Sequence, residues 1–254
     1  MVIKTGIISK VAVSFMGIDI YWYAILITSA IIIGYIWIKC NDGKFNIKFD
    51  DVFDLSLFMI PIAVICARLY YIIFNAEYYL NSPNEILNFR NGGIAIYGAL
   101  IGAVVTILIF CKIKKINLLN LLDYLAPIIP LAQAIGRWGN YINIEAYGSE
   151  TTLPLKMEII ENGITKYVHP TFLYESVGNI ILFFILLKIS KKRKFSGQIA
   201  CLYFIGYAFI RFWVEGLRTD SLMLGNIRIS QLISIIIFII GIVIYYEREN
   251  KRKK

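Results

Sequence analysis

Three arginines stand where arginine is rarely found. Arg68 and Arg211 lie inside long apolar runs, and Arg137 follows the end of another. An arginine at the centre of a membrane helix costs about 2.5–3.5 kcal/mol, so these positions need a reason. The planar fork of a guanidinium binds a phosphate through two parallel hydrogen bonds. If the runs cross a membrane, the three arginines lie at similar depth and predict an anion site.

Ion pairing between helices is the alternative explanation of the same arginines. Arg211, Glu215 and Arg218 are spaced i, i+4 and i+7, so they share one face if a helix continues through them. Glu215 would then neutralise either arginine, and Glu145 and Glu175 are further candidate partners. Both explanations stay open at this point.

The densest polar stretch directly follows an apolar run. It reads GRWGNYINIE at 136–145 and ends in a tyrosine and a glycine at 147–148. Glycine permits close backbone approach, and the amide of asparagine both donates and accepts hydrogen bonds. Arg137, Asn140, Asn143 and Glu145 would therefore suit a lipid headgroup. A re-entrant turn that satisfies its own backbone is the alternative.

The remaining groups favour neither a metal nor an organic cofactor. The only histidine, His169, precedes Pro170, and one histidine cannot build a metal site. The four cysteines have no CxxC spacing and lie in or beside apolar runs, as buried free thiols do. Gly98 and Gly102 form a GxxxG pair, which favours helix packing, and Tyr97 beside them would point towards a neighbouring helix.

Composition indicates which elements position these groups. The 254 residues are 58% apolar and 17% charged, with a mean hydropathy of +0.68. Soluble domains are about 45–50% apolar and about 25% charged, so an ordinary soluble globule is excluded. Aromatic residues make up 15%, as expected where side chains gather at two membrane–water interfaces. The sequence predicts an all-α integral membrane protein.

Seven runs are long enough to cross a bilayer, since a helix needs about 20 apolar residues to span about 30 Å of hydrocarbon. The predicted spans are 20–38, 55–74, 92–111, 118–135, 171–187, 197–214 and 229–246. Together they define a transmembrane domain over 20–246, with an N-terminal arm at 1–19 and a basic tail at 247–254.

The basic residues predict how the spans point. Sixteen Lys and Arg side chains flank one side of the membrane and seven flank the other. The positive-inside rule then puts the N-terminus outside and the C-terminus in the cytoplasm. The basic clusters become contacts for anionic membrane lipids rather than for nucleic acid. An insert at 149–169 is then extracytoplasmic, and its Asn162-Gly163 pair predicts a small hairpin.

Six motifs follow one another along the chain: WYA at 22–24, ARLYYIIF at 67–74, NGGIAIYGALIG at 91–102, GRWGNYINIEAYG at 136–148, HPTFLYES at 169–176 and RFWVEGLR at 211–218. They resemble the motifs of the bacterial prolipoprotein diacylglyceryl transferases, for which GRxGN is highly specific. The resemblance implies a multi-pass enzyme of the bacterial cytoplasmic membrane. Such an enzyme moves the diacylglyceryl group of phosphatidylglycerol to the lipobox cysteine of a prolipoprotein signal peptide. A thioether forms and glycerol-1-phosphate leaves.

The resemblance also implies roles for single residues. In that family the arginine of GRxGN contacts the lipid phosphate and is essential, which corresponds to Arg137. The essential arginine that opens RFxxE corresponds to Arg211. We expect both to be catalytic, because they would stabilise the charge that builds on the phosphate. Further implied residues are Tyr23, Asn140, Gly148, Glu215 and Arg218, and the substrate-binding set is completed by Arg68, Asn143 and Glu145.

Tyr97 is a departure from the family pattern. Many members have a histidine in this motif, proposed as a base, where this chain has tyrosine. A tyrosine is a poor base at neutral pH because a phenol ordinarily titrates near pH ~10. We therefore expect Tyr97 to act in catalysis by orienting the thiol or the phosphate through a hydrogen bond.

A seven-span carrier for an anionic solute is the alternative function. Carriers are commonly built from repeated halves with paired interrupted helices. The sequence has no repeated halves and no such pair. A structural scaffold is a third class, but it would leave the three arginines without a purpose.

Overall fold

The computed structural model describes residues 1–6, 8–15, 17–88 and 92–253. The chain forms two compact units, one of Met1–Cys40 with Leu122–Lys254 and one of Asn41–Leu121. Arg137 and Arg211 belong to the larger unit, whereas Arg68 and Tyr97 belong to the smaller one. Asn91, the first residue of the NGG motif, lies outside the described residues.

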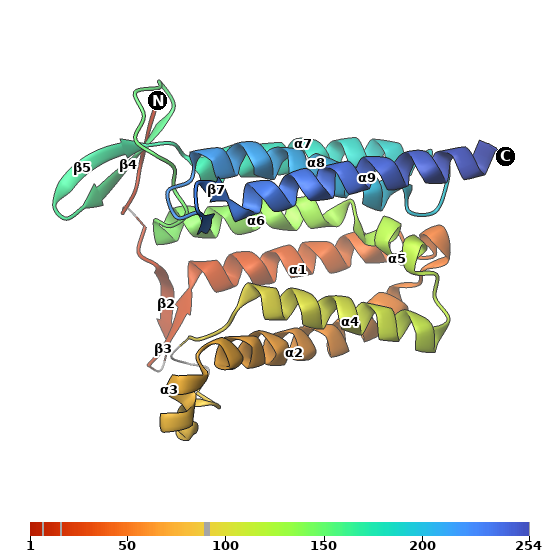
Figure 1. Cartoon of the computed structure of the whole chain (residues 1–254), viewed down its shortest axis with the longest axis horizontal. Helices are drawn as coiled ribbons and strands as arrows, with labels where there is room; N and C mark the ends of the chain where they lie inside the picture. Colours follow the sequence, from red (N-terminus) through yellow and green to blue (C-terminus); the bar gives the residue numbers. More distant parts are fainter. Residues whose placement is uncertain (7, 16, 89–91, 254) are drawn as a thin grey trace. The chain divides into compact units, whose positions relative to one another are not determined.

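Most of the described chain is helical (Figure 1). Six helices are long and apolar enough to cross a membrane: α1 (Trp22–Cys40), α2 (Phe49–Phe74), α4 (Ile96–Lys114), α7 (Thr171–Ser190), α8 (Gln198–Leu217) and α9 (Ile229–Lys253). A bent pair, α5 (Leu118–Leu125) and α6 (Ile128–Asn143), makes a seventh span if it is counted as one. The prediction of a helical membrane protein with about seven spans is confirmed, and the orientation of the termini stays a prediction.

The fourth span differs from the prediction of one run over 118–135. The structure divides it into α5 and α6, which meet at an angle of 45°. Pro127 stands at the break, where its missing N–H removes a helical hydrogen bond. Helix α6 then continues to Asn143, so Arg137 lies within a helix and not after its end. Gly136 and Gly139 do not end α6, because a helix lets each backbone group in the membrane find a partner.

In the smaller unit, α2 and α4 pack closely through the two glycines of the GxxxG pair. A Cβ atom added at Gly98 would lie 2.5 Å from Cβ of Tyr70 and 2.8 Å from Cα of Ala67. A Cβ atom at Gly102 would lie 2.8 Å from Cβ of Cys66. The predicted packing role of this pair is confirmed. The unit also contains the short helices η1 (Lys44–Asn46), α3 (Ala76–Asn81) and η2 (Pro83–Glu85).

In the larger unit, α6 packs against α1 and α7, α7 packs against α8, and α8 packs against α9 (Figure 1). A buried carboxylate, Asp123 on α5, accepts hydrogen bonds from the backbone N–H of Gly197 at 2.7 Å and of Ala200 at 2.9 Å. It therefore caps the start of α8, which lacks an N-terminal side-chain cap of its own. Arg193 approaches the same carboxylate at 3.3 Å.

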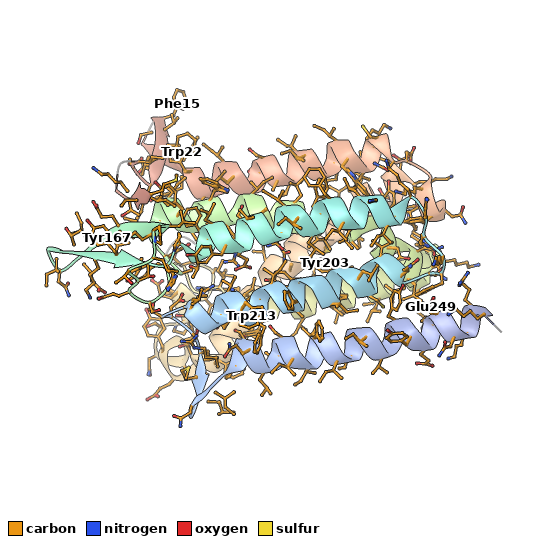
Figure 2. All side chains as sticks on the ribbon, turned by 90° about the horizontal axis from the view of Figure 1, so that it is seen from above. Phe15, Trp22, Tyr167, Tyr203, Trp213 and Glu249 are labelled. Carbon is orange, nitrogen blue, oxygen red and sulfur yellow. The ribbon has the colours of Figure 1, made fainter. Side chains whose placement is uncertain are left out.

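The predicted hairpin in the 149–169 insert is confirmed. Strand β4 (Lys156–Glu161) pairs antiparallel with β5 (Ile164–Val168). Asn162 and Gly163 form the turn, with φ values of 53° and 78°. Both residues thus adopt the left-handed backbone that a tight two-residue hairpin turn requires. Figure 2 shows Tyr167 on this hairpin, which projects beyond the ends of the helices of its unit.

The N-terminal segment contains strands that the sequence did not predict. Strand β1 (Val2–Lys4) pairs parallel with β4 and extends the hairpin to three strands. Strands β2 (Val11–Phe15) and β3 (Ile18–Tyr21) form a second hairpin in the same segment. A third hairpin, of β6 (Met223–Leu224) and β7 (Ile227–Arg228), lies between α8 and α9. Because β1 joins residues more than 150 positions away, no local pattern in the arm reveals it.

Candidate functional site

A buried carboxylate joins the two arginines that the sequence selects. Glu175 on α7 is 1% exposed. Its Oε1 accepts a hydrogen bond from Nη2 of Arg137 on α6 at 2.7 Å, and its Oε2 accepts one from Nη1 of Arg211 on α8 at 3.2 Å. The hydroxyl of Tyr207 on α8 also donates to Oε1, at 3.3 Å. Three helices thus converge on one carboxyl group.

A second buried carboxylate holds Arg211 from its own helix. Nη2 of Arg211 lies 2.5 Å from Oε2 of Glu215, which confirms the predicted i, i+4 pair. Helix α8 ends at Leu217, and Arg218 is the extended C-cap residue. Arg218 therefore does not continue the helical face, but it still forms an ion pair with Glu215 at 4.0 Å and a closer one with Asp220 at 2.7 Å. Arg137, Glu175, Tyr207, Arg211 and Glu215 are called the charged cluster below.

The charged cluster leaves its cations more accessible than its anions. Arg137 and Arg211 keep 21% and 17% of their side chains exposed, whereas Glu175 and Glu215 keep 1–2%. With two guanidiniums and two carboxylates, the formal charges balance. The exposed groups of the cluster are nevertheless the two guanidiniums. Their positive charge and N–H donors attract an approaching anion.

Asparagines continue the cluster along α6. Oδ1 of Asn140 accepts a hydrogen bond from Nη1 of Arg137 at 3.0 Å. Nδ2 of Asn140 donates to Oε1 of Glu145 at 2.7 Å, and Asn143 donates to the same oxygen at 3.4 Å. Of the three candidate partners of the arginines, the structure pairs Glu175 and Glu215 with them, whereas Glu145 accepts hydrogen bonds from the two amides.

Gly148 places the end of the GRWGNYINIEAYG motif beside the end of α8. Its N–H donates to the carbonyl of His169 at 3.0 Å, and it forms an isolated β-bridge with Arg218. A Cβ atom at this position would lie 2.6 Å from Cβ of His169 and 3.0 Å from the carbonyl oxygen of Leu217. Only glycine fits between these backbones.

Tyr23 packs on α6 at the glycine of the GRxGN element. A Cβ atom at Gly139 would lie 2.7 Å from Cε2 of the Tyr23 ring and 3.2 Å from its Cγ. Gly139 thus lets the aromatic ring of α1 lie directly against the helix that carries Arg137 and Asn140. The structure therefore places Tyr23 next to this segment.

We expect Gly139→Ala to lower the thermal stability of the folded protein. The added methyl group must push the Tyr23 ring away, and such overpacking typically costs about 1–3 kcal/mol. The matched control is Gly136→Ala on the same helix, where a Cβ atom meets nothing within 4 Å. Thermal unfolding in lipid nanodiscs should show a lower midpoint for Gly139→Ala only; equal midpoints would contradict the close packing.

Asp220 gives a pH-dependent contact at the end of α8. Its carboxylate accepts two hydrogen bonds from Arg218, at 2.9 and 2.7 Å, and these hold the pKa of Asp220 below its ordinary value. The stabilisation is present above the unfolded pKa of about 3.9 and is lost as the pH falls through the lower folded value. We expect Asp220→Asn to lower the thermal midpoint slightly at pH ~7, because a half-exposed pair contributes under about 1 kcal/mol. Midpoints of variant and parent should converge as the pH falls through the folded pKa of Asp220; a constant gap would contradict this assignment.

Arg68 and Tyr97 are described within the smaller unit. Arg68 is 4% exposed, and its guanidinium donates to the backbone carbonyls of Glu85, Ile86, Asn88, Gly92 and Gly93. It therefore organises the segment that precedes α4. Tyr97, at the start of α4, is 44% exposed, and its ring lies 6.4 Å from that of Tyr70.

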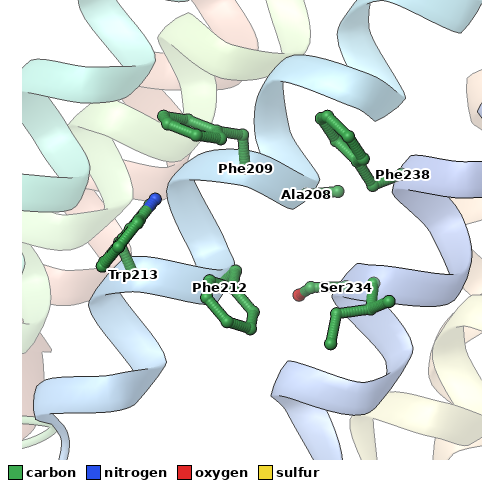
Figure 3. Close-up of a pocket in the computed structure, with 7 residues that line it drawn as sticks. Ala208, Phe209, Phe212, Trp213, Ser234 and Phe238 are labelled. Atoms are coloured by element: carbon green, nitrogen blue, oxygen red, sulfur yellow. The ribbon is translucent and has the colours of Figure 1, made fainter. Parts of the chain in front are cut away.

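An apolar pocket of about 270 Å³ lies between α8 and α9 (Figure 3). It is lined by Ala208, Phe209, Phe212, Trp213, Ser234, Ile235 and Phe238. The α8 part of this lining comes from the same turns that carry Arg211. Its apolar walls suit a hydrocarbon group.

Sequence reasoning missed Tyr207 and the central position of Glu175. Tyr207 had a signal, since it precedes Arg211 by four residues and lies on the same face of α8. The sequence indicated Glu175 only as a candidate partner of an arginine. Its contacts with both arginines depend on how α6, α7 and α8 pack.

The fold and the charged cluster define a multi-pass membrane protein with paired arginines and carboxylates buried among its helices. The sequence model of the family described as "Prolipoprotein diacylglyceryl transferase" matches residues 10–247, almost the whole chain. The chain therefore belongs to the prolipoprotein diacylglyceryl transferase family, which confirms the resemblance inferred from the six motifs.

Three similar proteins carry the name phosphatidylglycerol–prolipoprotein diacylglyceryl transferase. The protein of Finegoldia magna is 48% identical over 236 residues, covering 92% of this chain and 94% of its own. That of Clostridioides difficile is 46% identical over 244 residues, covering 95% and 97%. That of Clostridium novyi is 44% identical over 251 residues, covering 96% and 98%. These names favour a transferase over a carrier.

Proposed function

We propose that this chain transfers the diacylglyceryl group of phosphatidylglycerol to the lipobox cysteine of prolipoproteins in the bacterial cytoplasmic membrane. The observation that carries the proposal is the pair of guanidiniums held on one buried carboxylate, in a chain of this family. Fixed guanidinium donors suit a phosphodiester anion, because charge-assisted hydrogen bonds from arginine to phosphate are strong and directional.

The reaction replaces a C–O bond with a C–S bond. The thiolate of the lipobox cysteine attacks the carbon of the diacylglyceryl group that bears the phosphate, because the thiolate is the nucleophilic form of cysteine. A thioether forms, and the electron pair of the broken C–O bond goes to the phosphate oxygen. Glycerol-1-phosphate thereby gains one negative charge, which the proton released by the thiol balances.

Arg137 and Arg211 are proposed to bind the phosphate and to stabilise its growing charge. Their positive field also favours the thiolate over the thiol. Glu175 orients both guanidiniums through its two hydrogen bonds, and Glu215 lies beside Arg211 as an ion-pair partner. Tyr97 is proposed to orient the thiol or phosphate. The proposed lipid-binding set contains Tyr23, Arg68, Asn140, Asn143, Glu145, Gly148, Glu215 and Arg218.

The direct test supplies both substrates. Purified protein in nanodiscs containing phosphatidylglycerol is incubated with a lipobox peptide, and the peptide mass is measured. We expect a gain of one diacylglyceryl group, with no gain when serine replaces the peptide cysteine or when phosphatidylethanolamine replaces phosphatidylglycerol. An unchanged peptide mass from folded, lipid-embedded protein would contradict the proposal. Flux of an anionic solute into vesicles, without lipid chemistry, would favour the carrier instead.

A further inference from the structure

A second polar layer lies beside the charged cluster, one helical turn further along each of the same three helices. Gln133 precedes Arg137 by four residues on α6, Asn179 follows Glu175 by four on α7, and Tyr203 precedes Tyr207 by four on α8. Residues four apart share one face of a helix. Gln133, Asn179 and Tyr203 are called the inner layer below.

Gln133, Asn179 and Tyr203 are displaced from the charged cluster in the same direction, although the residue numbers fall on α6 and α8 and rise on α7. The reason is that α7 runs antiparallel to its two neighbours. Along α7, contacts at Glu175 and Leu182 are made with Arg211 and Gly206 of α8, so the numbers rise on one helix and fall on the other. On α6, Ala134 accepts a hydrogen bond from the Ser176 hydroxyl at 3.0 Å, within one turn of the Arg137–Glu175 pair. The inner layer therefore lies at one level of the bundle.

Direct contacts link the inner layer to the charged cluster. Nε2 of Gln133 donates to the Tyr203 hydroxyl at 3.1 Å. The rings of Tyr203 and Tyr207 stack with centroids 6.0 Å apart, and Tyr207 donates to Glu175. Figure 2 places Tyr203 well along α8, away from both ends of the helix.

The inner layer contains polar atoms that the described residues do not satisfy. Asn179 is 0% exposed, and neither its Nδ2 nor its Oδ1 has a hydrogen-bond partner among them. Oε1 of Gln133 is likewise buried and unpartnered within that part of the chain. Such atoms are costly in a membrane interior, where lipid offers no hydrogen bond. One donor and two acceptors thus need a small ligand that can both donate and accept.

We propose that Gln133 and Asn179 bind a buried water one helical turn from the charged cluster, with Tyr203 holding the Gln133 amide in place through its hydrogen bond. Water fits because the three side chains are neutral and because internal water typically makes about three hydrogen bonds to buried polar groups. It donates to the oxygens of Gln133 and Asn179 and accepts from the amide of Asn179. The charged cluster then borders, on the side of the inner layer, a water molecule that its charges can polarise.

The first test needs no variant. An experimental structure of the full chain in lipid, at a resolution that shows other buried waters, should contain ordered density bridging Gln133 and Asn179. A dry contact, with the two amides bonded directly to protein atoms, would overturn the proposal.

The second test is a double-mutant cycle on thermal stability. Asn179→Leu and Gln133→Leu should each lower the thermal midpoint by about 2–12 °C, because each leaves the shared water with unmatched partners. The double variant should lose less than the sum, since apolar groups on both sides remove the need for water. Additive losses, or a higher midpoint for Asn179→Leu alone, would overturn the proposal.

Ser234→Ala supplies the matched control for the cycle. Ser234 on α9 is also buried, but its hydroxyl donates to the Ser230 carbonyl of its own helix at 2.7 Å. Combined with Asn179→Leu, it should be additive. If Asn179→Leu does not fold, Asn179→Ser replaces it: serine keeps a polar group and leaves room for a second water, so its loss should be smaller and still non-additive with Gln133→Leu.

Discussion

Replacing Arg137 with alanine is expected to lower the turnover of diacylglyceryl transfer by about a hundred- to a thousandfold. This is the loss that follows removal of one preorganised donor to a developing anion. Arg137 is preorganised because Glu175 and Asn140 each accept a hydrogen bond from a different nitrogen of its guanidinium. The measurement is the rate of lipobox-peptide lipidation in nanodiscs at saturating phosphatidylglycerol.

Two controls separate the proposed role from charge and folding. Arg252→Ala removes the same charge from the exposed end of α9 and should leave turnover unchanged. Arg137→Lys keeps the charge but cannot reach both partners with a planar fork, so it should restore only part of the rate. Near-normal turnover of folded Arg137→Ala would contradict a role of this arginine in catalysis.

The sequence predicted the membrane helices because each span must be apolar over about 20 residues, and such a pattern is local. It also predicted the hairpin, since Asn162-Gly163 specifies its turn locally. It did not predict the break between α5 and α6 or the strand β1. The break depends on how the chain accommodates Pro127, which has no N–H, within an apolar run. Strand β1 depends on its partner β4, which lies far along the chain.

Of the candidate site, the sequence predicted the arginines but not which carboxylates they contact. Arg137 and Arg211 were found because a charge inside an apolar run, or directly after one, is visible without a structure. The choice between an anion site and ion pairs could not be made from sequence, because it depends on which carboxylates meet the arginines in space. The structure contains the ion pairs, and the guanidiniums keep the larger exposed fraction. The two explanations are therefore compatible for Arg137 and Arg211.

Glu175→Gln tests how the two explanations combine. The change keeps the shape of the side chain but leaves Arg137 and Arg211 without the carboxylate that they share. Breaking a buried pair by removing one partner costs about 3–5 kcal/mol, so the thermal midpoint should fall by about 6–20 °C in neutral phosphatidylcholine nanodiscs. Glu247→Gln is the matched control, because Glu247 forms an exposed pair with Lys251 and should leave the midpoint unchanged.

Phosphatidylglycerol should then restore more stability to Glu175→Gln than to the parent protein. The variant cluster carries one excess positive charge, and a lipid phosphate bound by the same guanidiniums replaces the missing negative charge. The measurement is the rise in thermal midpoint as phosphatidylglycerol replaces phosphatidylcholine in the nanodisc. A larger rise for Glu175→Gln than for the parent and for Glu247→Gln is expected. Equal rises in all three proteins would mean that the lipid stabilises the fold from elsewhere, and the arginine pair would then be an ion-pair network without a phosphate to bind.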